Sequence, residues 1–336
     1  MAKNYNLKKS MPYHLATDIS VVSPSYNGVS ALPYLAPVVK SALSIENGYL
    51  TELDGITEKA VVSVLTPGTM LGAANCDWKG NAASGSTTSL TLGESVLDVT
   101  DMMVNQSVCR KTIYPSWVAI NMKGRDGSIP AEFGDFLMST VANKAASEVE
   151  SAIYRGGATT GFKGLLSNDG VFDAAGLGAS RLAAATAVTI NALSASNIIA
   201  EVGKVYAKAG LNVPGLIGKD DTQILLGSEA YAMYQQGLAT SGSNQGVNMQ
   251  GTNQSFGALT YLGVPVNLAP GMFADAIIMC QKSNLFLGTN LGTDLTEAKL
   301  IPFYEYDGSD NVGVSMKMAW GVQAGIQSDV VLGKTF

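Results

Sequence analysis

The sequence predicts an α+β fold built from one long helix, several short strands and a β-hairpin that projects from the body. Apolar residues recur at helical spacing over residues 129–157. They alternate with small or polar residues over residues 312–320, which is typical of a strand with one buried face. A hydrophobic fraction of 46% supplies a sizeable core, so we expect an ordered chain of about two domains.

Charged residues are scarce in this chain. They make up 14% of it, against about 25% in a typical soluble domain. The net charge of -6 repels nucleic-acid phosphates, which excludes a strongly basic nucleic-acid binder. The chain therefore has close to half the usual supply of charged residues with which to cover a solvated surface.

The N-terminal third contains an arm and a hairpin. Residues 1–45 include four prolines and have neither helical nor strand periodicity, which predicts an extended arm. Residues 57–112 have β character. The small polar run GNAASGSTTS, residues 80–89, separates two strand-like halves and predicts a long hairpin with this run at its tip.

Residues 129–157 form the strongest predicted helix. Pro130 lies in its first turn, where the missing N–H is tolerated. Glu132 favours the positive end of the helix dipole, and Gly156 is a typical stop. At about 1.5 Å per residue, such a helix is long enough to cross a domain.

The second half mixes helices and strands. Helices are predicted over residues 194–210 and 228–237, and strands over residues 222–227, 263–269, 276–280, 284–288 and 312–320. No Asp, Glu, Lys or Arg occurs from Ala230 to Ala274. The middle of that stretch is rich in Gly, Asn, Gln and Ser, which predicts a long loop.

The sequence offers no catalytic machinery. His14 is the one histidine, it lies in the proline-containing arm, and no GxSxG motif accompanies it. The carboxylate pairs Glu148 with Glu150 and Asp220 with Asp221 fit solvated positions better than a general acid and base. We therefore predict that the chain is not an enzyme and has no catalytic residue.

Metal and cofactor sites are not predicted either. Cys76, Cys109 and Cys280 lack the CxxC spacing of zinc sites, and no second histidine is available. The glycine-rich segments at residues 176–181 and 215–220 depart from phosphate-binding patterns. Cys76 and Cys109 could face each other across the hairpin base in a disulfide or a metal site, although buried thiols are the favoured interpretation.

The sequence also lacks targeting signals. The first twenty residues contain lysines but no apolar region of a secretory signal, and the longest uncharged apolar segment, residues 182–200, contains several polar side chains. We expect no membrane span and a protein made and retained in a cytoplasm.

Several segments follow one another in a characteristic order. After the arm and the hairpin come a long helix ending in YRGG, then GFKGLLS, YLGVPVNLAPGM, AIIMCQKSNLFLG and VGVSMKMAWGVQAG. In this order they resemble the major capsid proteins of tailed bacteriophages, which share the Hong Kong 97-type shell fold. The resemblance covers nearly the whole chain and lies in the order and type of segments rather than in invariant residues.

The resemblance implies a division into domains. The N-terminal arm would be residues 1–50, the extended β-hairpin loop residues 51–112, the peripheral domain residues 113–190 and 301–336 with its spine helix at residues 130–155, and the axial domain residues 191–300.

The resemblance also implies a function. The chain would be a major capsid protein that self-assembles into pentamers and hexamers of an icosahedral head enclosing double-stranded DNA. Trp78, Leu90 and Leu92 of the hairpin are the candidate subunit contacts. The expected location is the capsid of a virion assembled in the host bacterial cytoplasm.

The implied partners are other copies of the chain and packaged DNA contacted non-specifically, with no membrane. Because the sequence starts directly with the arm, we expect a separate scaffolding protein, together with a portal. Some family members crosslink a hairpin lysine to a distant asparagine. Lys79 lies in the hairpin here, but no partner asparagine is identified, so crosslinking is not predicted.

Three alternatives stay open. One is an encapsulin-like nanocompartment shell of the same fold, which holds cargo enzymes instead of DNA. Another is a small-molecule-binding α/β enzyme, which the lack of a site constellation disfavours. The third is a decoration or tail-tube protein, against which the long helix argues.

Overall fold

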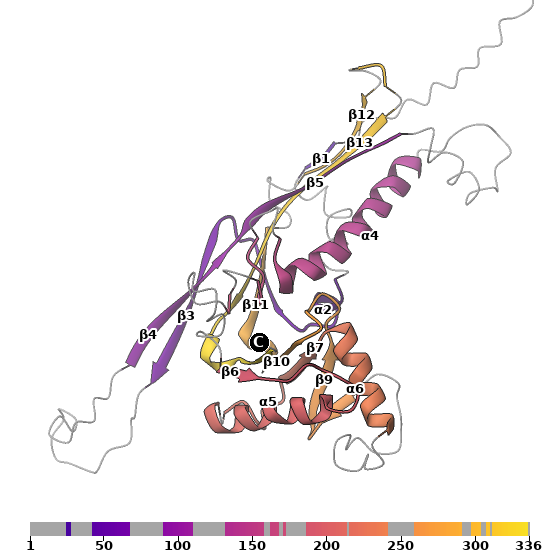
Figure 1. The fold of residues 1–336 in the computed structure, drawn as a ribbon. Helices are drawn as coiled ribbons and strands as arrows, with labels where there is room; N and C mark the ends of the chain where they lie inside the picture. The colour runs from indigo at the N-terminus through magenta and orange to yellow at the C-terminus, as the bar shows by residue number, and fades with distance from the viewer. Residues whose placement is uncertain are drawn as a thin grey trace, which may run out of the picture.

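Two sheets, three longer helices and a projecting hairpin make up the described part of the chain (Figure 1). The computed structural model describes residues 25–27, 42–67, 90–109, 132–157, 162–167, 171–172, 186–213, 215–240, 259–290, 297–303, 307–309 and 311–334. The predicted α+β class is confirmed.

The first sheet is built around its longest strand, β13. β5 pairs antiparallel with one side of β13, while β12 and then β11 pair with the other. The sheet order is β1-β12-β13-β11-β2, with β5 beside β13. The strands are β1 (Ser25–Asn27), β2 (Thr51–Asp54), β5 (Thr100–Cys109), β11 (Leu285–Thr289), β12 (Glu297–Pro302) and β13 (Asn311–Ala324).

The alternation predicted for residues 312–320 is confirmed in β13. Val314, Met316 and Trp320 are fully or almost fully buried on the face that packs against helix α4 (Glu132–Arg155), whereas Lys317 on the other face is exposed. Gly313 on that other face is buried because the ring of Phe303 lies against it. The predicted long helix is thus the cover of the inner face of the first sheet.

The central strands of the second sheet, β7, β10 and β14, are buried on both faces. Leu225 in β7 packs with the α4 core, while its neighbours Ile224 and Leu226 pack with a second core under helices α5 and α6. Burial on both sides explains why these strands read as continuous apolar runs rather than alternating ones. The order is β6-β14-β10-β7-β9-β8. The elements are β6 (Thr186–Thr189), α5 (Ile198–Asn212), β7 (Thr222–Leu226), α6 (Ser228–Thr240), β8 (Leu259–Tyr261), β9 (Val264–Leu268), β10 (Ala276–Gln281) and β14 (Val331–Lys334).

The sheets divide the chain at other places than the expected domain boundaries. β11 lies within residues 191–300 yet belongs to the first sheet, and β14 lies within residues 301–336 yet pairs with β10 and β6 in the second. The domain division itself stays a prediction.

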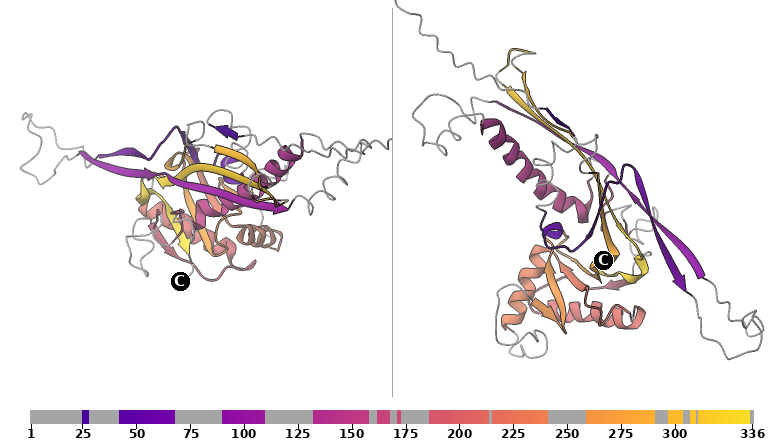
Figure 2. Two further views of the ribbon diagram at one scale, coloured as in Figure 1. Left: turned by 90° about the horizontal axis from the view of Figure 1, so that it is seen from above. Right: turned by 180° about the vertical axis from the view of Figure 1, so that it is seen from behind.

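The predicted hairpin is present. β3 (Lys59–Pro67) and β4 (Leu90–Asp98) pair antiparallel over nine residue pairs and extend away from the sheets (Figures 1 and 2). The expected second half of the hairpin is shorter than predicted, because the chain from Thr100 onward pairs with β13 as β5. The tip run at residues 80–89 lies outside the described residues.

A short helix, α2 (Leu43–Glu46), was not predicted; it lies at the end of the expected arm. The described helices include none that is long and apolar enough to cross a membrane.

Candidate assembly surfaces

The outward face of the hairpin carries exposed apolar side chains. The register places Val61 opposite Val96 and Leu65 opposite Leu92, so these residues share one face. Val61 is 55%, Leu92 60% and Val96 42% exposed. Because these side chains are largely exposed in the monomer, they contribute little to its stability and can pack against another apolar surface.

The opposite face of the hairpin contacts the body near its base. Leu97 is completely buried, and it lies so close to Gly288 in β11 that a side chain there would meet it. The hydroxyl of Ser95 donates a hydrogen bond to the carbonyl of Ala324 at 2.8 Å. The alternation of the two strands therefore turns one face to the body and the other face outward.

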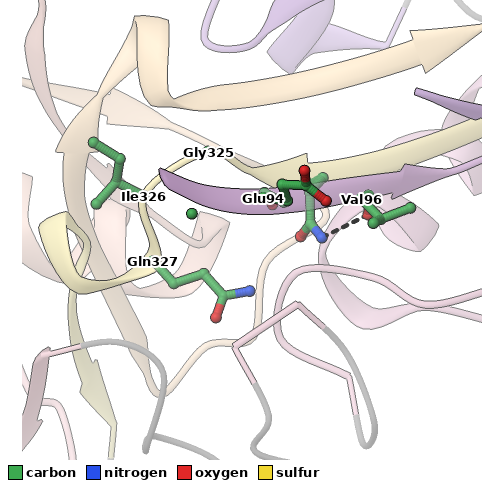
Figure 3. Close-up of a pocket in the computed structure, with 8 residues that line it drawn as sticks. Glu94, Val96, Gly325, Ile326 and Gln327 are labelled. Atoms are coloured by element: carbon green, nitrogen blue, oxygen red, sulfur yellow. Dashed lines mark hydrogen bonds between the residues drawn. The ribbon is translucent and has the colours of Figure 1, made fainter. Parts of the chain in front are cut away.

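The hairpin leaves the body through a tight crossing. A Cβ at Gly321 in β13 would collide with the carbonyl oxygen of Asp98, so only glycine allows this approach. The Gln323 side-chain amide donates to the Val96 carbonyl at 2.8 Å, the bond drawn in Figure 3. Together with the Ser95 bond, these contacts fix the angle at which the hairpin projects.

A pocket of about 320 Å³ lies at this elbow, between β4 and the segment after β13 (Figure 3). It is open and mixed in character, with Glu94, Gln323 and Gln327 as its larger polar side chains. Ser95 also lines it, but its hydroxyl donates to the backbone carbonyl of Ala324 rather than to a base that could activate it as a nucleophile.

A second hollow, of about 290 Å³ and mostly apolar, lies between α4 and β5. Val104, Val149 and Met318 contribute to its walls, and Glu148 is its one charged residue. Among the described strands β5 pairs only with β13, and Met103 on it is 57% exposed. This hollow is a further apolar surface that the described residues leave open.

The three predicted contact residues are placed unequally. Leu92 lies on the outward face, and Leu90 follows it in register opposite Pro67, with its side chain outside the described residues. Trp78 also lies outside them. Sequence reasoning missed Val61 and Val96, because their pairing depends on a register that the loop sequence alone did not fix.

The expectation of a solvated Glu150 is wrong. Its side chain is buried, and its carboxylate accepts hydrogen bonds from the backbone N–H and the hydroxyl of Ser44 at 3.0 and 2.7 Å. Since the Ser44 hydroxyl donates its one proton to Glu150, the Tyr154 hydroxyl must donate to Ser44, at 2.8 Å. Burial and the Glu150 charge raise the pKa of Tyr154 well above its usual value, so it keeps this proton.

This cluster joins α2 to α4, and it is a structural contact rather than a reactive site. Glu148, two residues from Glu150, is exposed and pairs with Lys144 at 3.7 Å, as expected of a solvated position. Asp221 accepts a hydrogen bond from Ser283 near the surface.

The described cysteines do not form a metal site. Cys280 is completely buried in β10, which raises the pKa of its thiol to about 12, and Cys109 is a half-buried free thiol. Within the described ranges no group of three or more His, Cys, Asp or Glu could hold a metal ion. Cys76 and His14 lie outside the described residues, so the structure does not describe whether Cys76 faces Cys109.

The fold is similar to that of solved phage capsid structures. The capsid of an empty GTA particle matches with a TM-score of 0.54 and 13% identity, covering 88% of this chain and 91% of that chain. Gordonia phage Cozz matches with a TM-score of 0.53 and 16% identity, covering 87% and 86% of the two chains. The satellite phage P4 procapsid, which includes a size determination protein, matches with a TM-score of 0.50 and 12% identity, covering 90% and 98%.

This chain therefore has the Hong Kong 97-type capsid fold. The predicted resemblance is thus confirmed at the level of the fold. No protein-family model and no curated protein matches the sequence. Within this capsid fold, the outward hairpin face and the hollow beside β5 are apolar surfaces that the described part of the monomer does not cover.

Proposed function

We propose that the chain is the major capsid protein of a bacteriophage, which self-assembles into pentamers and hexamers of an icosahedral head around double-stranded DNA. The observation that carries this proposal is the likeness to capsid structures over almost nine-tenths of the chain. A match of this extent leaves little of the chain for an additional catalytic domain. We therefore propose a structural, non-enzymatic role in the virion capsid, with assembly in the host bacterial cytoplasm.

The proposed parts follow the observed sheets. The first sheet with α4 as its spine helix would be the peripheral domain, and the second sheet with α5 and α6 the axial domain. The β3–β4 hairpin would be the extended loop, and residues before α2 the arm. This assignment keeps the proposed order of domains but follows the strand pairing at their boundaries.

The hairpin supplies the proposed main contact between subunits. Its outward face presents Val61, Leu92 and Val96, and we propose that Leu90 and Trp78 extend the same contact. A contact made by a few side chains is weak alone, since stable interfaces bury roughly 1,200 Å² or more. Many simultaneous contacts per subunit make a closed shell far more stable than any pair.

The net charge of the chain fits a shell that encloses DNA without binding it tightly. With a net charge of -6, the chain as a whole repels phosphates, so contacts with packaged DNA would be few and non-specific. We propose a separate scaffolding protein and a portal as further partners. The matched P4 procapsid includes a size determination protein, which is a precedent for an additional protein in a shell of this fold.

The experiment is to purify the full chain and to measure its mass by light scattering over a series of protein and salt concentrations, with negative-stain imaging of the largest species. Capsomers or closed particles are expected. A stable monomer under every condition, with a melting temperature raised by a small ligand, would contradict the proposal and favour a binding protein or enzyme. Particles from producing cells that hold protein cargo and no DNA would favour the nanocompartment alternative.

A further inference from the structure

The turn between β8 and β9 has an unusual residue in it. Tyr261 pairs with Val264, so Leu262 and Gly263 form a two-residue connection at the start of β9. Their φ angles are 47° and 87°. Two positive φ angles are the mark of a type I′ turn, in which Asn-Gly is the favoured pair. In the described part of the chain, Leu262 is the one non-glycine residue with positive φ.

Leucine is a poor choice for this position in an isolated subunit. The left-handed conformation brings its Cβ close to the backbone carbonyl oxygen, a steric cost that glycine avoids and that asparagine tolerates. The side chain of Leu262 is also 46% exposed, so burial within the monomer does not offset this cost. A bulky residue held in such a conformation indicates a selected role outside the stability of the monomer.

Two contacts with neighbouring helices hold the hairpin that carries the turn. The ring of Tyr261 meets that of Tyr206 on α5 edge-on, with centroids 5.7 Å apart, which fixes the flank of the turn. The Tyr234 hydroxyl on α6 donates to the Thr260 carbonyl at 3.0 Å, so the edge of β8 is already capped there. A partner would therefore meet side chains rather than extend the sheet by adding a strand.

The lack of charge favours a second copy of this chain over a charged partner. The described residues 230–240 and 259–274 contain no Asp, Glu, Lys or Arg, so two copies of this hairpin meet without like-charge repulsion between these residues and without removing one of their charges from water. A charged partner would find no opposite charge on this segment. Apolar and aromatic residues free of charge are the usual composition of an interface core.

We propose that Leu262 is a subunit-contact residue that packs against the β8–β9 hairpin of a second copy. The inference rests on the proposed self-assembly and names one contact in it. The pairing of Tyr261 with Val264 keeps the turn in its strained conformation, and the exposed side chain of Leu262 is available for burial on association. The cost to the monomer is recovered when the leucine leaves water.

The test uses Leu262→Asn, which suits the type I′ turn and removes the apolar contact. We expect opposite signs in two measurements. The melting temperature of the unassembled protein should rise by about 1–3 °C, because the strain is relieved. The protein concentration required for assembly should rise about tenfold, because a buried apolar contact is lost.

Leu211→Asn is the matched control. Leu211 lies near the end of α5 and is 80% exposed, but its φ is not positive. This variant should assemble within about twofold of wild type, with no rise in melting temperature. Leu262→Ala should lose assembly like the Asn variant without the gain in melting temperature.

Three results would overturn the inference. They are assembly of Leu262→Asn at the wild-type concentration, a fall in its melting temperature, or an equal loss of assembly in Leu211→Asn. If wild-type protein fails to assemble under every condition, the proposed function fails and this inference with it. If wild-type protein assembles and the Leu262 variants assemble at the same concentration, this inference fails and the proposed function stands.

Discussion

Apolar residues alternate with other residues both in β13 and in the strands of the β3–β4 hairpin, but their solvent exposure differs. Val314 and Met316 in β13 have no solvent exposure, whereas Val61 and Leu92 in the hairpin are more than half exposed. α4 covers the apolar face of β13, while the outward face of the hairpin has no cover among the described residues. Burial within one chain stabilises the fold, and the same pattern left uncovered is available for contacts between chains.

The largest expected effect comes from a substitution in the core between α4 and β13. Trp320 is 1% exposed and packs against Phe162, with ring centroids 4.1 Å apart. Trp320→Ala should lower the free energy of unfolding by about 3–5 kcal/mol, because it removes a large buried side chain and leaves a cavity. Urea denaturation followed by circular dichroism measures this loss. A loss below about 1 kcal/mol would show that α4 does not cover this face in solution.

Two glutamates on one helix make the same comparison with polar groups. Glu150→Gln should cost about 1–3 kcal/mol of unfolding free energy, because the buried carboxylate accepts two hydrogen bonds from Ser44. Glu148→Gln is the control and should cost less than about 0.5 kcal/mol, because its pair with Lys144 is exposed. Thermal unfolding of both variants at one pH checks the difference, and equal losses would contradict it.

Substitutions on the outward face of the hairpin should weaken assembly strongly and change the stability of the fold little. Replacing Leu92 and Val96 together with Asn should change the free energy of unfolding by less than about 1 kcal/mol, since both side chains are exposed. The concentration required for assembly should rise at least about tenfold. Ser63→Asn, on the same hairpin face, is the control and should assemble normally. Normal assembly of the double variant would remove the hairpin face from the proposed contacts.

The smallest effect concerns the thiols and leaves stability unchanged near neutral pH. Burial raises the pKa of Cys280 to about 12, from an ordinary value of 9.0, so this thiol stays protonated and unreactive at pH 8. Cys109 is half-buried and should be labelled first of these two by a maleimide, as peptide mass spectrometry would detect. The contribution of Cys280 to stability is complete below about pH 9 and decreases as the pH rises toward 12, because only the unfolded thiol ionises there. Rapid labelling of Cys280 in folded protein would contradict its burial.

Local patterns were sufficient for most individual elements. The long helix, the strand with Trp320 and the apolar strands β7 and β10 were predicted because their periodicities are intrinsic to the chain. The hairpin was predicted too, but its end was not, because β4 and β5 form one continuous β-type segment whose two halves pair with different partners. The short helix α2 was not predicted, because four residues are too few to show a helical periodicity of apolar residues.

The candidate contact surface was predicted only in part. Leu92 could be chosen because it alternates with Leu90 beside the tip run. Val61 and Val96 become part of the same face only through cross-strand register, and Glu150 becomes a buried acceptor only because α2 packs on α4. The positive φ of Leu262 likewise depends on the pairing of β8 with β9, which a leucine at that position would not suggest.

The sequence by itself determined the α+β class, the positions of the long helix and main strands, and a surface poor in charge, because these depend on residue types and local spacing. Only the tertiary structure decided which apolar faces are covered and which stay open. That choice depends on contacts between segments far apart in the chain, such as α4 on β13 and Leu97 against Gly288. Alternation shows that a strand has an apolar face, but the packing of another element decides whether that face is buried in the same chain.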